Sequence, residues 1–330
     1  MLETTTVGSF PKPDSLKQAR AKVRRGQLSA AELKRAEEQA TRECVALQEE
    51  LGLDILVDGE MYRGDMATYF AESLEGFTIS SLVRSYGNRY YRKPIATGPI
   101  RWTKPITVEW YRFAQGLTNK PVKGMLTGPY TMMDWSFDEQ YPNRRAFALA
   151  LAAAIHEEVR ALEQAGATYI QIDEPAVSTR PEEIDLAIET MKIVTNGIQA
   201  KTITHICYGD FERVYPKMLE LAVDQIDLEL ANSQYALLET FKKAPFTKEI
   251  GLGVLDVHSH RVETVEQIKG YLTKALEVFK PEQIMVDPDC GLKTRTIEES
   301  RAKLASMVTA VREFKREHLS HKSDKQQVTS

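Results

Sequence analysis

Short apolar runs alternate with longer amphipathic segments along most of the chain, and this alternation restricts the possible folds more than any other feature. Short apolar runs are typical of buried strands, and apolar residues spaced three and four apart are typical of helices. The pattern predicts eight strands, over residues 4–10, 54–60, 123–128, 169–173, 201–207, 225–230, 250–257 and 283–287. It also predicts helices, the clearest over residues 30–51, 143–165, 181–196, 262–279 and 297–317.

Strands that alternate with helices, without a change of composition along the chain, predict an α/β fold with one (β/α)8 TIM barrel. We expect this barrel to be a catalytic domain over residues 1–317, followed by a polar, disordered tail over 318–330. Residues 76–103 are rich in Tyr, Arg, Gly and Ser and have no helical period. We expect them to form an insertion or hairpin after strand two, where loops commonly contribute to an active site.

The composition argues for a cytoplasmic protein with reduced cysteines. With 42% hydrophobic residues, a net charge of -4 and a pI near 6.0, the chain gives no reason to expect nucleic-acid or membrane binding. It shows no apolar run long enough to span a bilayer and no signal peptide at its start. Its three cysteines, Cys44, Cys207 and Cys290, are too few and scattered for a disulfide framework, which favours metal binding or catalysis.

Polar side chains cluster at the C-terminal ends of the predicted strands, the face that carries the chemistry in barrels of this kind. In chain order, these ends are Gly8-Ser9-Phe10, Asp58-Gly59-Glu60, Thr127-Gly128-Pro129, Asp173-Glu174-Pro175, His205-Ile206-Cys207, Glu229, Asp256-Val257-His258 and Asp289-Cys290-Gly291. We therefore expect the functional site to lie on this face.

Four of these side chains are suited to zinc. His205 and Cys207 are two apart on one predicted strand, so they point the same way. Glu229 and Cys290 end two further strands and complete a ligand set that suits zinc in softness and geometry. The alternative is a core histidine and buried cysteines with a solvated carboxylate. Zinc held by thiolates favours keeping a substrate thiol deprotonated over activating water, which points to alkyl transfer to sulfur.

Three other residues have two interpretations each. Glu60 and Asp173 are placed to receive a substrate ammonium group, although the segment Asp173-Glu174-Pro175 is equally suited to capping the next helix. His258 is a candidate proton donor, because histidine titrates near neutral pH, but a hydrogen-bonded core histidine is the alternative.

Six motifs resemble the catalytic barrel of the cobalamin-independent methionine synthase family, over residues 1–316. They are TTTVGSFP at 4–11, MLTGP at 125–129, QIDEPA at 171–176, HICY at 205–208, DVHS at 256–259 and PDCGLKTR at 288–295. The resemblance implies that zinc is bound by His205, Cys207, Glu229 and Cys290. It implies that homocysteine is bound by Val7, Gly8, Ser9, Glu60 and Asp173. It further implies His258 as proton donor, and a methyl-donor pocket with Arg89, Tyr90 and Trp135.

The chain departs from the family pattern in three ways. It has one barrel instead of two, Thr179 where the family has an acidic folate contact, and Ser259-His260 in place of Ser-Pro. Short members of this kind resemble enzymes that take methyl from a corrinoid. The sequence therefore predicts a zinc-dependent methyltransferase that makes L-methionine from L-homocysteine, with methylcobalamin or a methylated corrinoid protein as donor.

Other functions stay open at this point. The same reaction with 5-methyltetrahydrofolate is one alternative, and methyl transfer to another thiol such as coenzyme M is a second. A metal- or corrinoid-binding module without activity is a third. The basic residues of the insertion suggest a docking face for a corrinoid protein, or else a solvated loop; they are Arg84, Arg89, Arg92 and Lys93.

Overall fold

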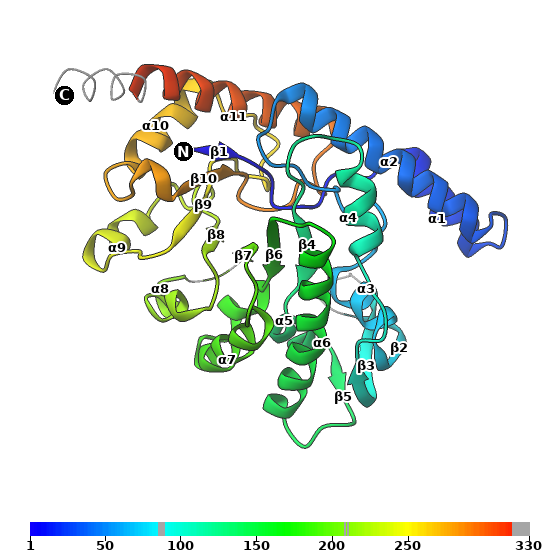
Figure 1. Ribbon diagram of the computed structural model, residues 1–330. Coiled ribbons are helices and arrows are strands. Elements are labelled where there is room, and N and C mark those ends of the chain that lie inside the picture. Colours follow the sequence, from blue (N-terminus) through cyan, green and yellow to red (C-terminus); the bar gives the residue numbers. More distant parts are fainter. Residues whose placement is uncertain (85–89, 208, 210, 319–330) are drawn as a thin grey trace. The chain divides into compact units, whose positions relative to one another are not determined.

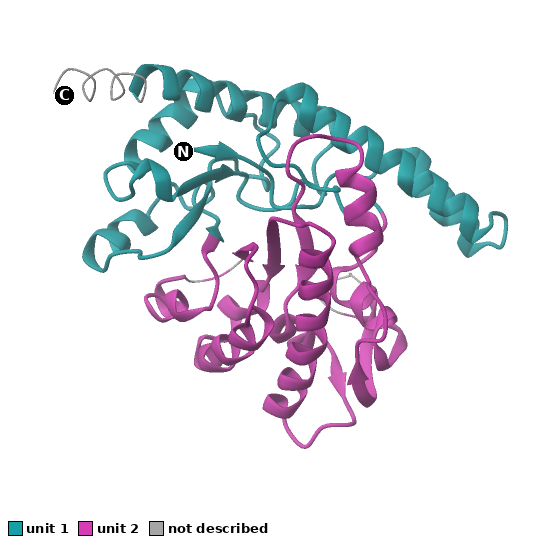
Figure 2. Cartoon of the chain, in the orientation of Figure 1, with its two compact units in different colours: residues 1–61, 227–330 teal, residues 62–226 magenta. Residues whose placement is uncertain are grey.

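The computed structural model describes residues 1–84, 90–207, 209 and 211–318. The chain divides into two compact units, coloured in Figure 2. Unit 1 comprises Met1–Met61 and Asp227–Ser330, and unit 2 comprises Tyr62–Ile226. The single domain over residues 1–317 stays a prediction, and the predicted tail lies, apart from residue 318, outside the described residues.

Unit 1 is built on parallel strands covered by helices (Figure 1). Strand β10 pairs with β1 on one side and with β9 on the other, and Val286 is in register with Leu252. The side chains of Leu252, Val286 and, from α11, Leu304 are fully buried and belong to the core of this unit. Its elements are β1 (Glu3–Thr4), α1 (Asp14–Arg24), α2 (Ala30–Leu51), α9 (Leu237–Lys243), β9 (Glu249–Gly253), α10 (Val265–Ala275), the 3₁₀ helix η4 (Pro281–Gln283), β10 (Ile284–Asp287) and α11 (Ile297–His318).

Unit 2 has parallel strands of its own and a separate antiparallel hairpin. Strand β6 pairs in parallel with β4 and with β7. The long helix α6 buries Leu151, Ile155 and Val159 in the core of this unit. Its elements are α3 (Met66–Ser73), β2 (Glu75–Arg84), β3 (Tyr90–Arg101), α4 (Val108–Gln115), β4 (Gly124–Thr127), α5 (Pro129–Asp134), β5 (Phe137–Asp138), α6 (Arg144–Gln164), β6 (Tyr169–Asp173), η1 (Pro175–Thr179), η2 (Pro181–Glu183), α7 (Ile184–Val194), β7 (Lys201–Ile206), α8 (Phe211–Val214) and η3 (Lys217–Glu220).

The strands β1-β10-β9-β8-β7-β6-β4, in that order, belong to one sheet, in which β8 is Gln225–Leu228. Six of these seven strands correspond to predicted strands, whereas the predicted strand over residues 4–10 is reduced to β1, which includes only Thr4 of that range. The predicted strand over residues 54–60 is reduced to one bridging residue, Leu56. The physical reason is a turn: Gly59 and Glu60 both have positive φ, 74° and 56°, and the Asp58 carboxylate accepts the N–H of Glu60. A strand cannot continue through such backbone angles.

Local signals fix the ends of the predicted helices. The predicted helix over residues 30–51 is α2, which begins after the capping box of Ser29 and Glu32 and ends at the left-handed Gly52. The predicted helix over 262–279 is shorter, because Thr264 caps α10 at Val265. Among the helices of the described residues, none is both long and apolar enough to cross a membrane.

The predicted insertion is a hairpin of β2 and β3 (cyan in Figure 1), which pair in antiparallel register from Glu75 with Arg101 to Arg84 with Tyr90. Gly76 allows the strands to approach closely: its φ is 92°, and a Cβ there would lie 2.5 Å from the Pro99 carbonyl oxygen. In the neighbouring strand β5, the exposed ring of Phe137 has the Lys93 ammonium 4.2 Å from its centroid. The hairpin therefore has a defined structure of its own.

Candidate metal and substrate site

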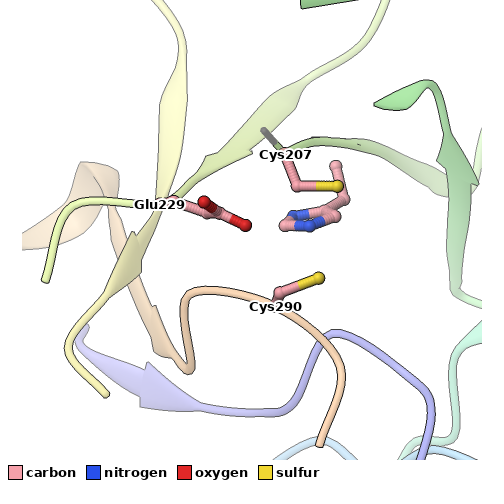
Figure 3. A group of neighbouring side chains, drawn as sticks. Cys207, Glu229 and Cys290 are labelled. Atoms are coloured by element: carbon pink, nitrogen blue, oxygen red, sulfur yellow. The ribbon is translucent and has the colours of Figure 1, made fainter. Parts of the chain in front are cut away.

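Ligand atoms of His205, Cys207, Glu229 and Cys290 all lie within 4.8 Å of one another. In Figure 3, the labelled side chains of Cys207, Glu229 and Cys290 point toward a common space. His205, Cys207 and Glu229 are 3–5% exposed, and Cys290 is partly exposed. The four residues that the sequence analysis selected as metal ligands thus form one group.

The chemistry of this group fits zinc. It offers an imidazole nitrogen, two sulfur atoms and a carboxylate oxygen, which is a four-ligand set of the type that zinc binds. Ligand atoms around a tetrahedral zinc are roughly 3.3–3.8 Å apart, which is compatible with the observed grouping. Burial of three of the four residues limits competition from water for the ligand atoms.

A single carboxylate connects the segments that carry Glu229 and Cys290. Asp289 accepts the backbone N–H groups of Leu230 (3.0 Å), Ala231 (2.9 Å) and Asn232 (2.6 Å). Burial raises the pKa of Asp289 to about 7, against the lowering effect of these N–H donors. Since Leu230 follows Glu229 and Asp289 precedes Cys290, this carboxylate sets how the two segments lie relative to each other.

His258 lies beside Glu229. Its Nε2 is 3.6 Å from the Glu229 Oε1, and its side chain is 31% exposed. The His258 backbone N–H donates to the Asp256 carboxylate at 2.8 Å, which shapes the loop after β9. The predicted proton donor therefore has solvent on one side and a predicted metal ligand on the other.

The segment with Val7, Gly8 and Ser9 packs against the loop that follows Cys290. The Ser9 carbonyl accepts the Leu292 N–H at 2.7 Å, and a Cβ on Gly291 would lie 2.1 Å from the Ser9 Oγ. The next residue, Phe10, donates its N–H to the Gly59 carbonyl, directly before Glu60. Unit 1 thus brings Ser9 close to the segments that carry Cys290 and Glu60.

Asp173 ends β6 in a buried polar network within unit 2. The Gln171 amide donates to the Asp173 Oδ1 at 2.7 Å, and the buried ammonium of Lys123 donates to the Gln171 Oε1. The Asp173 carbonyl accepts the Gly128 N–H, which ties the end of β6 to the end of β4. The network holds the Asp173 side chain in a defined orientation.

Glu174, next to Asp173, caps α5, which precedes it in the chain, and not the helix that follows it, as the sequence suggested. Its carboxylate accepts the N–H groups of Tyr130 (3.0 Å) and Thr131 (2.7 Å) at the start of α5, and its own N–H donates to the His205 carbonyl. Burial raises the pKa of Glu174 to about 7, despite these N–H donors. Glu174 therefore links β6, the start of α5 and the strand that carries His205.

The predicted methyl-donor pocket is described only in part. Trp135 is the C-cap of α5 and is partly exposed. Its backbone N–H donates to the Thr131 carbonyl. Tyr90 is the first residue of β3, and Arg89 lies outside the described residues. The pocket stays a prediction.

Sequence reasoning gave Asp289 no role and gave Glu174 only a possible capping role. Both residues are adjacent to predicted site residues, at strand ends that carry two polar groups in succession. The signal available in the sequence was that alternating side chains cannot both face the same site. In each pair, the carboxylate that is not assigned to the site, Glu174 or Asp289, has other partners, which are backbone N–H groups of a neighbouring segment.

Comparison with known proteins gives a consistent result. The family model described as cobalamin-independent synthase, catalytic domain, matches residues 2–313. A 5-methyltetrahydropteroyltriglutamate–homocysteine methyltransferase of Chelativorans sp. (strain BNC1) is 42% identical over 324 residues, which cover 94% of this chain and 42% of the relative. The chain thus spans less than half the length of that relative. A methionine synthase of Sulfolobus acidocaldarius is 39% identical over 309 residues, covering 93% of this chain and 91% of the relative.

A solved structure shows the same fold. The B12-independent methionine synthase from Shewanella sp. W3-18-1, in complex with selenomethionine, matches with a TM-score of 0.86 and 29% identity, over 97% of this chain and 99% of that one. Together with the seven-stranded sheet, this match confirms the predicted α/β barrel class.

The predicted methyl donor is wrong. The family is described as cobalamin-independent, and the Chelativorans relative is named for 5-methyltetrahydropteroyltriglutamate, which contradicts methylcobalamin as donor or cofactor. No corrinoid partner is indicated, so the docking face proposed for the basic insertion loses its basis. The error came from assigning folate binding to a second barrel, whereas the family match lies entirely within one catalytic domain. By this match and these relatives, the chain belongs to the cobalamin-independent methionine synthase family, of which it represents the catalytic domain.

Proposed function

We propose that this chain is a zinc-dependent methyltransferase that makes L-methionine from L-homocysteine, with a 5-methyltetrahydropteroylglutamate as methyl donor. The observation that carries the proposal is the group of His205, Cys207, Glu229 and Cys290, whose ligand atoms lie within 4.8 Å of one another. The names of the relatives supply the substrate and the donor.

The four residues of this group would hold the zinc. Bound there, the metal would lower the pKa of a coordinated thiol, so that the homocysteine sulfur is a thiolate near neutral pH. Two cysteine sulfurs among the ligands favour this role over the activation of water for hydrolysis.

The amino-acid end of homocysteine is assigned to carboxylates and to the segment that follows β1. Glu60 and Asp173 would pair with the ammonium group, and Ser9 with the backbone of Val7 and Gly8 would bind the carboxylate. The contact of Ser9 with the loop after Cys290 supports this assignment, because it places the segment that follows β1 next to a proposed zinc ligand. Binding both ends of the substrate orients the sulfur for in-line attack on the methyl carbon.

His258 is assigned the role of proton donor. As the sulfur–methyl bond forms, the bond between the methyl group and N5 of the folate breaks, and that nitrogen must receive a proton to leave as a neutral amine. The imidazolium of His258, whose Nε2 lies 3.6 Å from the Glu229 Oε1, would donate it. Trp135, together with Arg89 and Tyr90, is assigned to the donor pocket on the basis of the sequence resemblance.

The direct test is an assay of the purified chain for methionine, detected by mass spectrometry. We expect methionine from homocysteine with methyltetrahydropteroyltriglutamate, and loss of the reaction after zinc is removed with a chelator. No methionine with this donor, or turnover with methylcobalamin alone, would overturn the proposal.

The metal assignment is tested by Cys290→Ser. Mutation of groups that merely support a metal ligand weakens zinc binding by about 10–100-fold, so loss of a ligand should weaken it by more than roughly 100-fold. Zinc content, measured by elemental analysis, and activity should fall together. The matched control is Cys44→Ala, which removes a buried thiol in α2 whose pKa is raised by burial and which is not part of the group. Equal zinc content in Cys290→Ser and in the control would contradict the assignment.

A further inference from the structure

Lys303, on α11, is a fully buried lysine with a defined set of acceptors. Its ammonium donates to the Asp256 carbonyl at 3.0 Å, to the Arg261 carbonyl and to the Glu263 Oε2 at 2.9 Å. A lysine ammonium has three N–H donors. All three are used, and the three acceptors belong to one short segment, residues 256–263, which we term the His258 loop.

Glu263, which is 2% exposed, closes this loop. One carboxylate oxygen accepts from Lys303, and the other accepts the Asp256 N–H at 3.1 Å, at the opposite end of the loop. The Ser306 hydroxyl, one turn further along α11, donates to the Glu263 carbonyl. The two ends of the loop are thus held together and fixed to α11.

His258 lies inside this loop. Its backbone N–H donates to the Asp256 carboxylate at 2.8 Å, and Asp256 is the residue held by both Lys303 and Glu263. Its Nε2 lies 3.6 Å from Glu229. The position of the imidazole follows the backbone of the loop, because the side chain itself is partly exposed.

A buried Lys–Glu pair is weak evidence for stability, because its replacement by apolar residues is often neutral or stabilising. The two carbonyl acceptors of Lys303 are more informative, since they connect the ammonium to the backbone of the loop on either side of His258. We propose that Lys303 and Glu263 are positioning residues, which hold the His258 loop so that the imidazole stays at the reacting centre. The proposal rests on the proposed function in one respect, the role of His258 as proton donor.

Two variants separate positioning from stability. Lys303→Met leaves the buried carboxylate of Glu263 without its cation, so it destabilises the fold as well as the loop. In Lys303→Met/Glu263→Gln both charges are gone, and we expect the melting temperature to recover toward that of the wild type. Methionine donates no hydrogen bond to the two carbonyls, so kcat of the zinc-loaded double variant should stay roughly 100-fold low, with KM for homocysteine and zinc content unchanged.

The matched control is Lys269→Met. Lys269, on α10, also pairs with a glutamate of α11, Glu317, at 2.8 Å. Its described ion pairs include none with the His258 loop. This variant should leave kcat unchanged. A double variant that regains both stability and wild-type kcat would overturn the proposal, because the pair would then be purely structural.

Hydrogen exchange gives a readout that does not depend on activity. In the double variant, the backbone amides of residues 256–263 should exchange faster than in the wild type, and those of α10 should not. Unchanged exchange in the loop would also overturn the proposal. If the wild type makes no methionine, the proposed function fails, whereas faster exchange confined to the loop would still support its anchoring by Lys303 and Glu263.

Discussion

The carboxylate of Asp289 occupies the space that a side chain on Gly253 would fill. A Cβ on Gly253 would lie 2.2 Å from the Asp289 Oδ1 and 2.8 Å from the Leu228 carbonyl oxygen. From this position, at the end of β9, Asp289 reaches the N–H groups that follow Glu229. The absence of a side chain at Gly253 of β9 thus allows the segments that follow the two flanking strands, β10 and β8, to be joined beside the proposed zinc ligands.

Gly253→Ala should therefore displace Asp289. We expect a loss of about 1–3 kcal/mol in the free energy of unfolding, as for other overpacked sites, measured by urea denaturation. Zinc affinity, measured by competition with a chromophoric chelator, should fall as well, because the spacing of Glu229 and Cys290 changes.

The control for this variant is Gly270→Ala in α10, where a Cβ would meet nothing within 4 Å. Alanine is favoured over glycine inside a helix by about 0.5–1 kcal/mol, so this variant should be slightly more stable than the wild type. A Gly253→Ala protein with the stability and zinc affinity of the wild type would show that Asp289 does not set the spacing of the ligands.

Gly291 and Ser9 also approach each other closely, and a double variant can test this contact. In Gly291→Ala, the added Cβ would lie 2.1 Å from the Ser9 Oγ but 3.3 Å from the Ser9 Cβ. We expect destabilisation of about 1–3 kcal/mol. Adding Ser9→Ala removes the nearest atom, so the double variant should regain most of the lost stability in urea denaturation. Equal stability of the single and double variants would mean that the strain lies elsewhere.

Glu158 is expected to be important for the stability of unit 2. This fully buried carboxylate accepts from the Trp102 Nε1, from the Ile106 N–H, and from both the N–H and the hydroxyl of Thr107, at 2.7–2.9 Å. Glutamine offers one acceptor oxygen and directs an N–H₂ group at donors, so Glu158→Gln should lower the free energy of unfolding by about 2–4 kcal/mol. The adjacent Glu157→Gln, which removes only an exposed ion pair with Arg160, should change it by less than about 1 kcal/mol.

The stability contribution of Glu183 should depend on pH. Hydrogen bonds from Arg144 hold the pKa of Glu183 below its usual 4.5, and the Tyr130 hydroxyl adds to this effect. The unfolded chain therefore takes up the proton at a higher pH than the folded chain does, so the contribution is present above about pH 4.5 and is lost as the pH falls through the lower folded pKa. Urea denaturation of the wild type and of Glu183→Gln should show a difference near pH 7 that narrows toward about pH 3. A difference independent of pH would contradict this assignment.

Elements with strong local signals could be predicted from the sequence. The helix α2 carries its start and stop in Ser29, Glu32 and Gly52, and β6 is a buried run that ends just before Pro175. The segment 54–60 was misjudged, because its apolar run is followed by two residues with positive φ, of which Glu60 is not a glycine. Left-handed angles at a charged residue come from its surroundings and leave no mark in a local pattern.

The candidate site also has a part that the sequence could predict and a part that it could not. The metal group could be predicted because strand periodicity and the barrel rule place chemically suitable side chains on one face. The roles of Asp289 and Lys303 could not, since each depends on backbone groups tens of residues away, and any residue type supplies the same N–H and carbonyl groups. The methyl donor was misjudged because it was inferred from a resemblance to short, single-barrel enzymes and not from a residue that would bind it.

The order Lys123, Gln171, Asp173 determines which way a side-chain amide faces. Lysine only donates hydrogen bonds and an ionised carboxylate only accepts them, so Gln171 must present its oxygen to Lys123 and its nitrogen to Asp173. An amide is nearly symmetric in shape, and the two charges at its ends remove the ambiguity. The buried ammonium of Lys123 thereby fixes which end of the Gln171 amide faces Asp173, at the C-terminal end of β6.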